Sequence, residues 1–276
     1  METGILALHN LKKTYGNKTA VNIDSLAIQP RTFTCIVGKS GCGKTTLLRL
    51  LAGLETPDPK EKQDNTISER SALNTANQDA SVHSANKSAN APQSITGLPA
   101  KTAPVFQEPR LMPWLTVKEN IMFSLKGQDA NAMNANAALP SPEESYNQLL
   151  DKLELTDAAS LYPAQLSGGM AQRVSLGRTL FYDPELILMD EPFSALDYFT
   201  RRNLQDMVLR LFQHQKKTIL FVTHDVEEAL LLGDRILIME NGSIKADMPV
   251  PLPFPRKAAD PALQDMRQRI LDLLAE

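Results

Sequence analysis

Cysteine, tryptophan and long apolar runs are all scarce in this chain of 276 residues. The two cysteines do not form a CxxC pair: Cys35 falls in an apolar run and Cys42 in a glycine-rich loop. This usage predicts free thiols in a reducing compartment rather than a disulfide framework. No apolar run approaches the roughly 20 residues that cross a bilayer, so we expect no membrane-spanning segment. The first four residues also lack the basic and apolar stretch of a secretion signal, which favours a cytosolic location.

A basic excess is absent too. The chain carries 29 Lys and Arg against 32 Asp and Glu, a formal net charge of −3. Nucleic-acid-binding proteins usually present a basic face, so we expect no nucleic-acid partner. The hydrophobic content of 42% is enough for a sizeable core, in one large domain or two small ones.

Large apolar residues nearly disappear from residues 57–94, which hold only Ile67, Leu73 and Val82 and no aromatic residue. Such a segment cannot bury enough surface to offset the entropy lost on ordering. We predict a disordered surface insertion there, and a shorter low-complexity loop over residues 127–145. Loop expansion without a function of its own is the favoured interpretation of both.

The rest of the chain alternates β-rich and helical patterns. We predict strands at residues 5–8, 20–28, 32–37, 186–189, 218–223 and 235–240. Helices are predicted after residue 44, from residue 116, and at 146–153, 169–181, 198–213, 226–232 and 261–274. The loop 12–16 lies between the first two strands, and Asn241-Gly242 is typical of a hairpin turn. The alternation implies an α/β fold with a parallel sheet covered on both faces.

A phosphate-binding loop follows the strand at 32–37. Residues 38–45 fit the pattern G-x-x-x-x-G-K-[ST], with a strand before them and a helix after. The glycines let successive N–H groups face a phosphate, with the helix dipole behind them. Lys44 would neutralise phosphate oxygens, and the Thr45 hydroxyl would bind Mg²⁺. The residues predicted to contact ATP here are Gly38, Lys39, Ser40, Gly41, Cys42, Gly43, Lys44, Thr45 and Thr46.

Two carboxylates close the strand at 186–189. Asp190 stands where a P-loop fold places the acid that holds Mg²⁺. Glu191 comes next, and because successive strand residues point apart, its carboxylate could face the γ-phosphate and polarise the attacking water. We therefore predict Thr45 and Asp190 as metal-binding residues and Glu191 as the catalytic base.

A second glycine pair identifies the kind of ATPase. The segment Leu166-Ser167-Gly168-Gly169-Met170 lies at a predicted helix start, 23 residues before Asp190. It resembles the signature of ABC transporter ATPases, which contacts the γ-phosphate of an ATP held by the partner subunit. The Ser167 hydroxyl and the Gly169 amide suit an anion at the positive end of a helix. The family usually has Gln where Met170 stands, which leaves the Ser and Gly contacts intact.

The resemblance implies roles for four other positions. Gln107 is similar to the family's glutamine that senses Mg²⁺ and the attacking water, and His224 to its switch histidine at the γ-phosphate. Residues 194–197 resemble the segment through which two subunits touch. Tyr15 resembles the aromatic residue that stacks on adenine.

The resemblance also implies the architecture. We expect one ABC ATPase domain over residues 1–276: a P-loop fold with an N-terminal antiparallel β part, a helical subdomain at 108–180 and a C-terminal extension at 253–276. The family's hairpin after the phosphate-loop helix is replaced here by residues 57–94, and only Ile95-Thr96-Gly97 resembles its end. The N-terminal sheet is therefore predicted to be irregular.

Residues 107–117 and the tail from 253 are most similar to the nitrate, sulfonate and taurine importer group, where a Pro-Trp pair follows the glutamine. The resemblance implies a Mg²⁺-dependent ATPase that pairs head to tail with a second copy. It would bind transmembrane permease subunits on the cytoplasmic face of the membrane and act indirectly with a solute-binding protein. Trp114 could belong to the groove for the permease or to the core of the helical part.

Two alternatives remain open at this stage. A soluble ABC ATPase of DNA repair or translation usually carries a second ATPase half, coiled coils or zinc cysteines, and none is present in this sequence. A binding-only regulator would have lost catalytic residues, and every catalytic position is intact.

Overall fold

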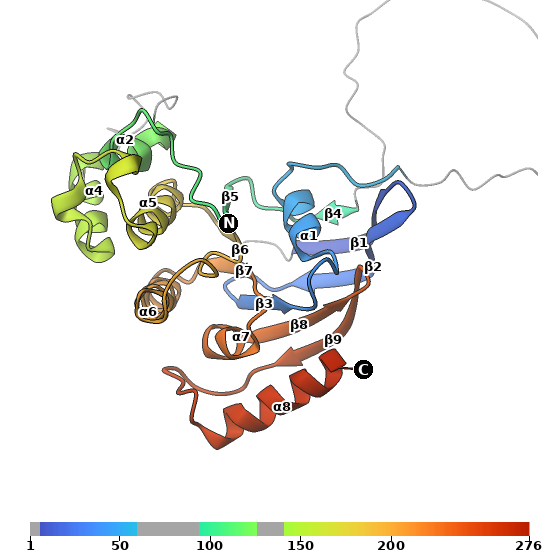
Figure 1. Ribbon diagram of the computed structural model, residues 1–276. Coiled ribbons are helices and arrows are strands. Elements are labelled where there is room, and N and C mark those ends of the chain that lie inside the picture. Colours follow the sequence, from blue (N-terminus) through green and yellow to red (C-terminus); the bar gives the residue numbers. More distant parts are fainter. Residues whose placement is uncertain (1–5, 60–93, 126–140, 276) are drawn as a thin grey trace, which may run out of the picture.

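The computed structural model describes residues 6–59, 94–125 and 141–275, arranged in two sheets with helices around them (Figure 1). The insertion predicted at 57–94 and the loop predicted at 127–145 lie mostly outside the described residues. The predicted α/β fold is confirmed. Helices and a second sheet pack on a central sheet whose strands are mostly parallel.

The central sheet has six strands in the order β5 (Thr102–Val105), β6 (Leu186–Asp190), β7 (Thr218–Val222), β3 (Phe33–Val37), β8 (Arg235–Glu240) and β9 (Ser243–Pro249). All neighbouring pairs are parallel except β8 and β9. These two form a hairpin around Asn241 and Gly242, both with positive φ, which confirms the predicted turn.

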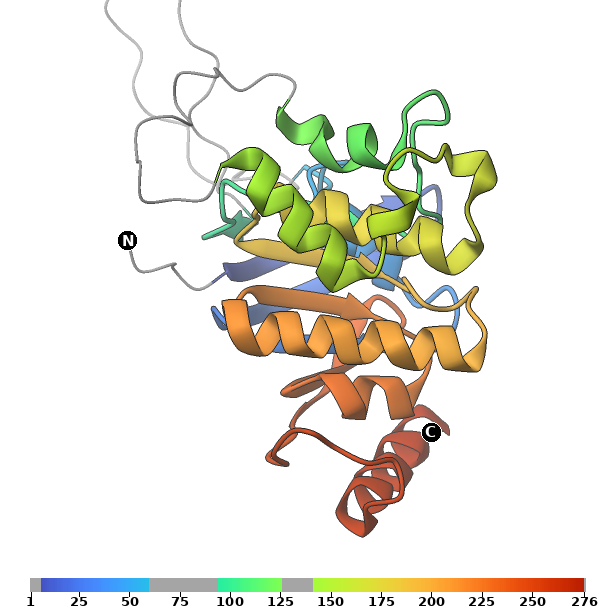
Figure 2. The same ribbon diagram turned by 90° about the vertical axis from the view of Figure 1, so that its left-hand side faces the viewer.

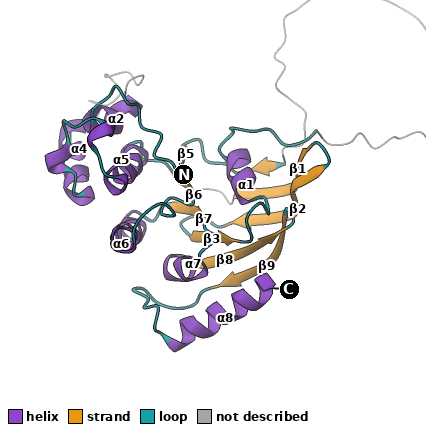
Figure 3. Ribbon diagram, viewed as in Figure 1, coloured by secondary structure: helices purple, strands orange, loops and turns teal. Residues whose placement is uncertain are grey.

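Both faces of this sheet are buried, as its continuous apolar strands require. In β6, Ile187 and Met189 point into one apolar cluster, whereas Leu186 and Leu188 point into another. Helices α5 (Gly168–Phe181), α6 (Tyr198–Gln215) and α7 (Val226–Leu232) cover the first face. Helix α1 (Lys44–Leu51) and a second sheet cover the other (Figure 3).

The second sheet is antiparallel, in the order β2 (Lys18–Ile28), β1 (Leu6–Tyr15) and β4 (Ile95–Thr96). The predicted strand at 5–8 is too short and the predicted loop at 12–16 is wrong, because β1 continues to Tyr15. Beyond residue 8 the strand is set by its pairing with β2, which continues to Tyr15 opposite Lys18, and Leu11 within this stretch is fully buried. Strand β4 pairs with β1 through Ala7 and Thr96, so the Ile95-Thr96 segment does complete this sheet.

The helical part contains α2 (Val117–Ile121) and α4 (Pro142–Leu153), which both pack against α5. Figure 2 shows these helices stacked above α6. Thr116 and Glu119 form a capping box at the start of α2. Ser141 and Glu144 form another at α4, so the low-complexity loop predicted to reach residue 145 is wrong for residues 142–145.

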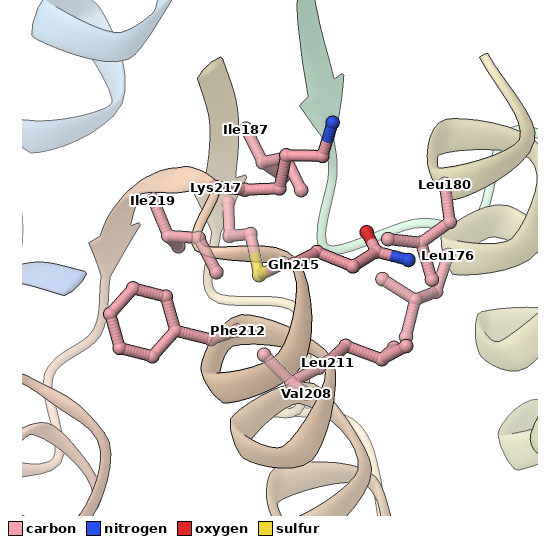
Figure 4. Close-up of a pocket in the computed structure, with 10 residues that line it drawn as sticks. Leu176, Leu180, Ile187, Val208, Leu211, Phe212, Gln215, Lys217 and Ile219 are labelled. Carbon is pink, nitrogen blue, oxygen red and sulfur yellow. The ribbon is translucent and has the colours of Figure 1, made fainter. Parts of the chain in front are cut away.

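The contact between α5 and α6 is mainly apolar (Figure 4). Leu176 and Leu180 of α5 meet Val208 and Leu211 of α6 around a narrow cavity of about 10 Å³. Lys217 lies beside it and pairs with an aspartate after α5 at 2.6 Å. The helical part therefore rests on the core through side-chain packing rather than through a sheet.

The C-terminal segment is anchored by a buried arginine. Arg256 donates hydrogen bonds to the carbonyls of Leu230, Gly233, Val250 and Leu252 at 2.6–3.2 Å. It thereby holds the chain after β9 against the end of α7, next to which α8 (Pro261–Ala275) packs. Among the described residues, no helix has the length and apolarity to cross a membrane.

Candidate active site

The loop between β3 and α1 is pressed against two neighbouring strands. Gly43 has φ +112°, and a Cβ added there would lie 2.0 Å from the carbonyl oxygen of Ala20 in β2. A Cβ on Gly38 would lie 2.2 Å from the carbonyl oxygen of Met239 in β8. Only glycine fits at these two positions, because the close atoms are backbone and cannot move aside.

Beside this loop lies a cavity of about 280 Å³ at the start of α1. The Lys44 ammonium is buried there and donates to the carbonyls of Gly38 at 2.8 Å and Lys39 at 3.1 Å. A glycine-rich loop at a helix N-terminus with a buried cation beside it suits a polyphosphate. The lining residues are Tyr15, Lys18, Ala20, Ser40, Gly41, Gly43, Lys44, Thr45, Thr46 and Glu191.

Two side-chain oxygens that could bind a metal meet beside the cavity. The Thr45 hydroxyl donates to Asp190 Oδ1 at 3.1 Å, joining α1 to the carboxyl end of β6. Burial raises the pKa of Asp190, and the hydrogen bond from Thr45 partly offsets this effect. A hydroxyl and a carboxylate next to a phosphate site are the hard oxygen donors that Mg²⁺ prefers, so the residues present fit this ion.

Glu191 turns away from Asp190 and pairs with His224. Its φ of +44° places it in the left-handed region, a strained conformation for a side chain with a Cβ. The Glu191 Oε2 to His224 Nδ1 distance is 2.9 Å. Asp190 contacts Thr45, whereas Glu191 contacts His224 and lines the cavity. The strand alternation from which we predicted this separation is wrong as its cause, because β6 ends at Asp190 and Glu191 has a positive φ.

Gln107 lies at the same edge of the sheet. Strands β5 and β6 are parallel neighbours with Val105 opposite Met189, so the residues after each strand emerge side by side. Gln107 is exposed, and Gln172 of α5 donates to the carbonyl of the preceding residue, Phe106, at 3.2 Å. This hydrogen bond joins the residue just before Gln107 to the helical part.

The signature residues lie outside this cavity. Ser167 is the N-cap of α5 and accepts a hydrogen bond from the Met170 amide at 3.2 Å. Gly169 packs against Thr200 at the start of α6, where a Cβ would come within 2.6 Å of the threonine methyl group. Ser167, Gly168 and Gly169 are absent from the cavity lining, so one chain does not bring them to its own phosphate loop.

The two aromatic residues singled out in the sequence have different outcomes. Tyr15 does line the cavity, half exposed, and its hydroxyl donates to Glu55, which raises the pKa of the tyrosine. Trp114 is 71% exposed, so the core interpretation is wrong. Lys18 also lines the cavity and was missed by sequence reasoning, although its place just after the turn that follows Tyr15 could have indicated it.

Comparison with known proteins identifies the family. The family model described as ABC transporter matches residues 21–194. The chain belongs to the ABC transporter family. It is 37% identical over 273 residues to an aliphatic sulfonates import ATP-binding protein of Granulibacter bethesdensis, covering 99% of this chain and 95% of that protein. A protein of the same name from Bacillus subtilis is 37% identical, covering 93% and 88%.

Solved structures agree with the fold and the activity. A dimeric ATP-binding cassette in a post-hydrolysis state with ADP and inorganic phosphate has a TM-score of 0.64 and 28% identity, covering 90% of this chain and 99% of that one. A dimeric bacterial ABC transporter cassette has a TM-score of 0.65 at the same identity and coverage. The chain is an ABC-type ATP-hydrolysing enzyme that binds ATP.

Replacing Gly43 by alanine tests the glycine packing. The new methyl group would meet the Ala20 carbonyl, so we expect ATP affinity to fall at least about tenfold as the loop moves. Gly53→Ala is the matched control: φ is +67° with no atom within 4 Å of the added Cβ, so it should cost about 1 kcal/mol of stability and leave affinity unchanged. Fluorescent-nucleotide titration and thermal unfolding measure both. Equal affinity in the two variants would contradict the packing argument.

Proposed function

We propose that this ATPase powers an ABC importer for sulfonates or related small anions. The main observation behind this proposal is that three groups suited to ATP hydrolysis lie at one edge of the sheet. They are the phosphate-binding loop, the Thr45–Asp190 pair and the Glu191–His224 pair. Relatives that match along nearly their whole length are named as aliphatic sulfonate import proteins, and this supports both import and the class of solute.

Each residue has a role in this proposal. Lys44 and the amides of residues 38–46 bind the phosphate chain, and Tyr15 stacks on adenine. Thr45 and Asp190, with Gln107 nearby, would hold Mg²⁺, which supplies charge neutralisation at the phosphate oxygens. Glu191 orients and deprotonates the attacking water, and His224 holds Glu191 while contacting the γ-phosphate.

Two copies complete the site. Because Ser167, Gly168 and Gly169 lie outside the cavity of their own chain, we infer that they serve the ATP of a second copy placed head to tail. The positive end of α5 then meets the γ-phosphate. The dimeric state of the similar cassettes supports this arrangement. ATP would favour the closed pair and hydrolysis the open pair, driving the permease subunits.

The proposed place in the cell follows from these partners. Permease subunits would hold the ATPase peripherally on the cytoplasmic face of the membrane, and a solute-binding protein would act through them. The exposed Trp114, within the segment 107–117, marks the surface proposed to meet the permease. A role in DNA repair or translation has no observation in its favour.

Glu191→Gln tests the assignment of the base. The amide keeps the shape but cannot accept a proton, so we expect the ATPase rate to fall about 10²–10⁴-fold while ATP still binds. Glu185→Gln is the control, an exposed glutamate just before β6, and should keep the full rate. Phosphate release and nucleotide titration give the two quantities. An unchanged rate in Glu191→Gln would show that another group is the base.

Co-purification and growth test the importer. From gently solubilised membranes of the native cell, we expect the tagged protein to carry a polytopic membrane protein in equal amount. Cells with only Lys44→Ala should fail to grow on an aliphatic sulfonate as sulfur source yet grow on sulfate. Recovery of ribosomal or DNA-repair proteins, or no partner at all, would contradict the importer. Growth on sulfonates with Lys44→Ala would contradict the solute class.

A further inference from the structure

Glu228 is a buried carboxylate that the proposed chemistry does not use. It lies in the first turn of α7, just after His224, and is only 6% exposed. Its Oε1 accepts a hydrogen bond from Gln205 Nε2 at 2.8 Å, and Gln205 of α6 is itself 4% exposed. Thr223, the residue before the histidine, lines a small cavity together with Glu228.

Arg201 joins this group to the segment that resembles a subunit contact. Its Nη2 donates to the Leu196 carbonyl at 3.0 Å, and its Nε, though buried, has no hydrogen bond with any residue that the structure describes. Arg201 and Glu228 line one cavity of about 30 Å³. The other lining residues are Glu191, Phe193, Ser194, Thr223, His224 and Asp225.

The contacts close into a ring. From Glu191 the path runs to His224 and along the chain to Asp225, whose carboxylate accepts from the Glu228 amide, and then from the Glu228 carboxylate to Gln205 of α6. From α6, Arg201 reaches Leu196, and the Ser194 hydroxyl returns to the Glu191 carbonyl at 3.0 Å. The base and the switch histidine are therefore connected to α6 by a network that includes Glu228.

Helix α7 does not need this carboxylate for its own stability. Asp225 Oδ1 already accepts from the amides of Glu227 at 2.9 Å and Glu228 at 3.2 Å, so the helix start is capped. Burying a carboxyl group is costly, and burial raises the pKa of Glu228. A stabilising role alone would be served as well by an apolar side chain.

We propose that Glu228 is a positioning residue for ATP hydrolysis: through Gln205 it anchors the start of α7 to α6, which keeps His224 opposite Glu191 and ties that pair to segment 194–197. This inference rests on the proposed roles of Glu191 and His224. Loss of the carboxylate lets the histidine loop shift, which lowers the rate of the chemical step without weakening the binding of ATP at the phosphate loop.

The test compares ATPase kinetics and thermal unfolding across four variants. For Glu228→Ala and Gln205→Met, we expect kcat to fall about tenfold or more with the KM for ATP within about twofold. The double variant Gln205→Glu with Glu228→Gln reverses the hydrogen bond and should recover kcat to within about threefold of wild type. Leu204→Ala, a fully buried neighbour on α6 outside the ring, should lower the unfolding temperature and leave kcat unchanged.

Each outcome decides the proposal. Unchanged kcat in both single variants would show that Glu228 is only structural. A loss of kcat that the reversed pair does not restore would show that the hydrogen bond is not the cause. If Glu228→Ala does not fold, Gln205→Met, which keeps the side-chain volume, carries the test alone. An unchanged rate in Glu191→Gln would instead overturn the proposed role of Glu191 on which this inference rests, so the two failures are distinguishable.

Discussion

The contact between the phosphate loop and the backbone of two strands is the constraint on which the site depends. Gly43 and Gly38 touch carbonyl oxygens of β2 and β8, so the loop cannot move without moving both sheets. That contact fixes the start of α1, places Lys44 over the loop and brings Thr45 to Asp190. The antiparallel sheet is therefore part of the phosphate site.

The parallel order of the central strands brings the other residues of the site together. Strands β5, β6 and β7 are neighbours, and each ends at the same edge, so Gln107, the two carboxylates and His224 emerge together from distant parts of the chain. Parallel sheets bind ligands at this edge for the same reason. The ring through Glu228 extends the arrangement below the surface, linking the loops after β6 and β7 through α6.

Local pattern predicted the strands and helices of the core well, because their apolar periods and caps agree with burial. Helix α7 and strand β8 match their predicted bounds, 226–232 and 235–240. The local pattern failed where contacts between distant residues or a helix cap determine the bounds of an element. Strand β1 runs to Tyr15 because it pairs with β2, and α4 starts at its capping box inside a segment of low-complexity composition. The ring through Glu228 joins residues far apart in sequence, so no local pattern contains it.

We propose that one chain holds the phosphate-binding loop and that a second copy supplies Ser167 to the same ATP. The most direct measurement is the mass, by light scattering, of the Glu191→Gln protein with ATP, compared with the same protein carrying Ser167→Arg. We expect a dimer for Glu191→Gln alone and a monomer when Ser167→Arg is added, with ATP bound to both proteins. A dimer that persists with Ser167→Arg, or a monomer in both cases, would contradict it.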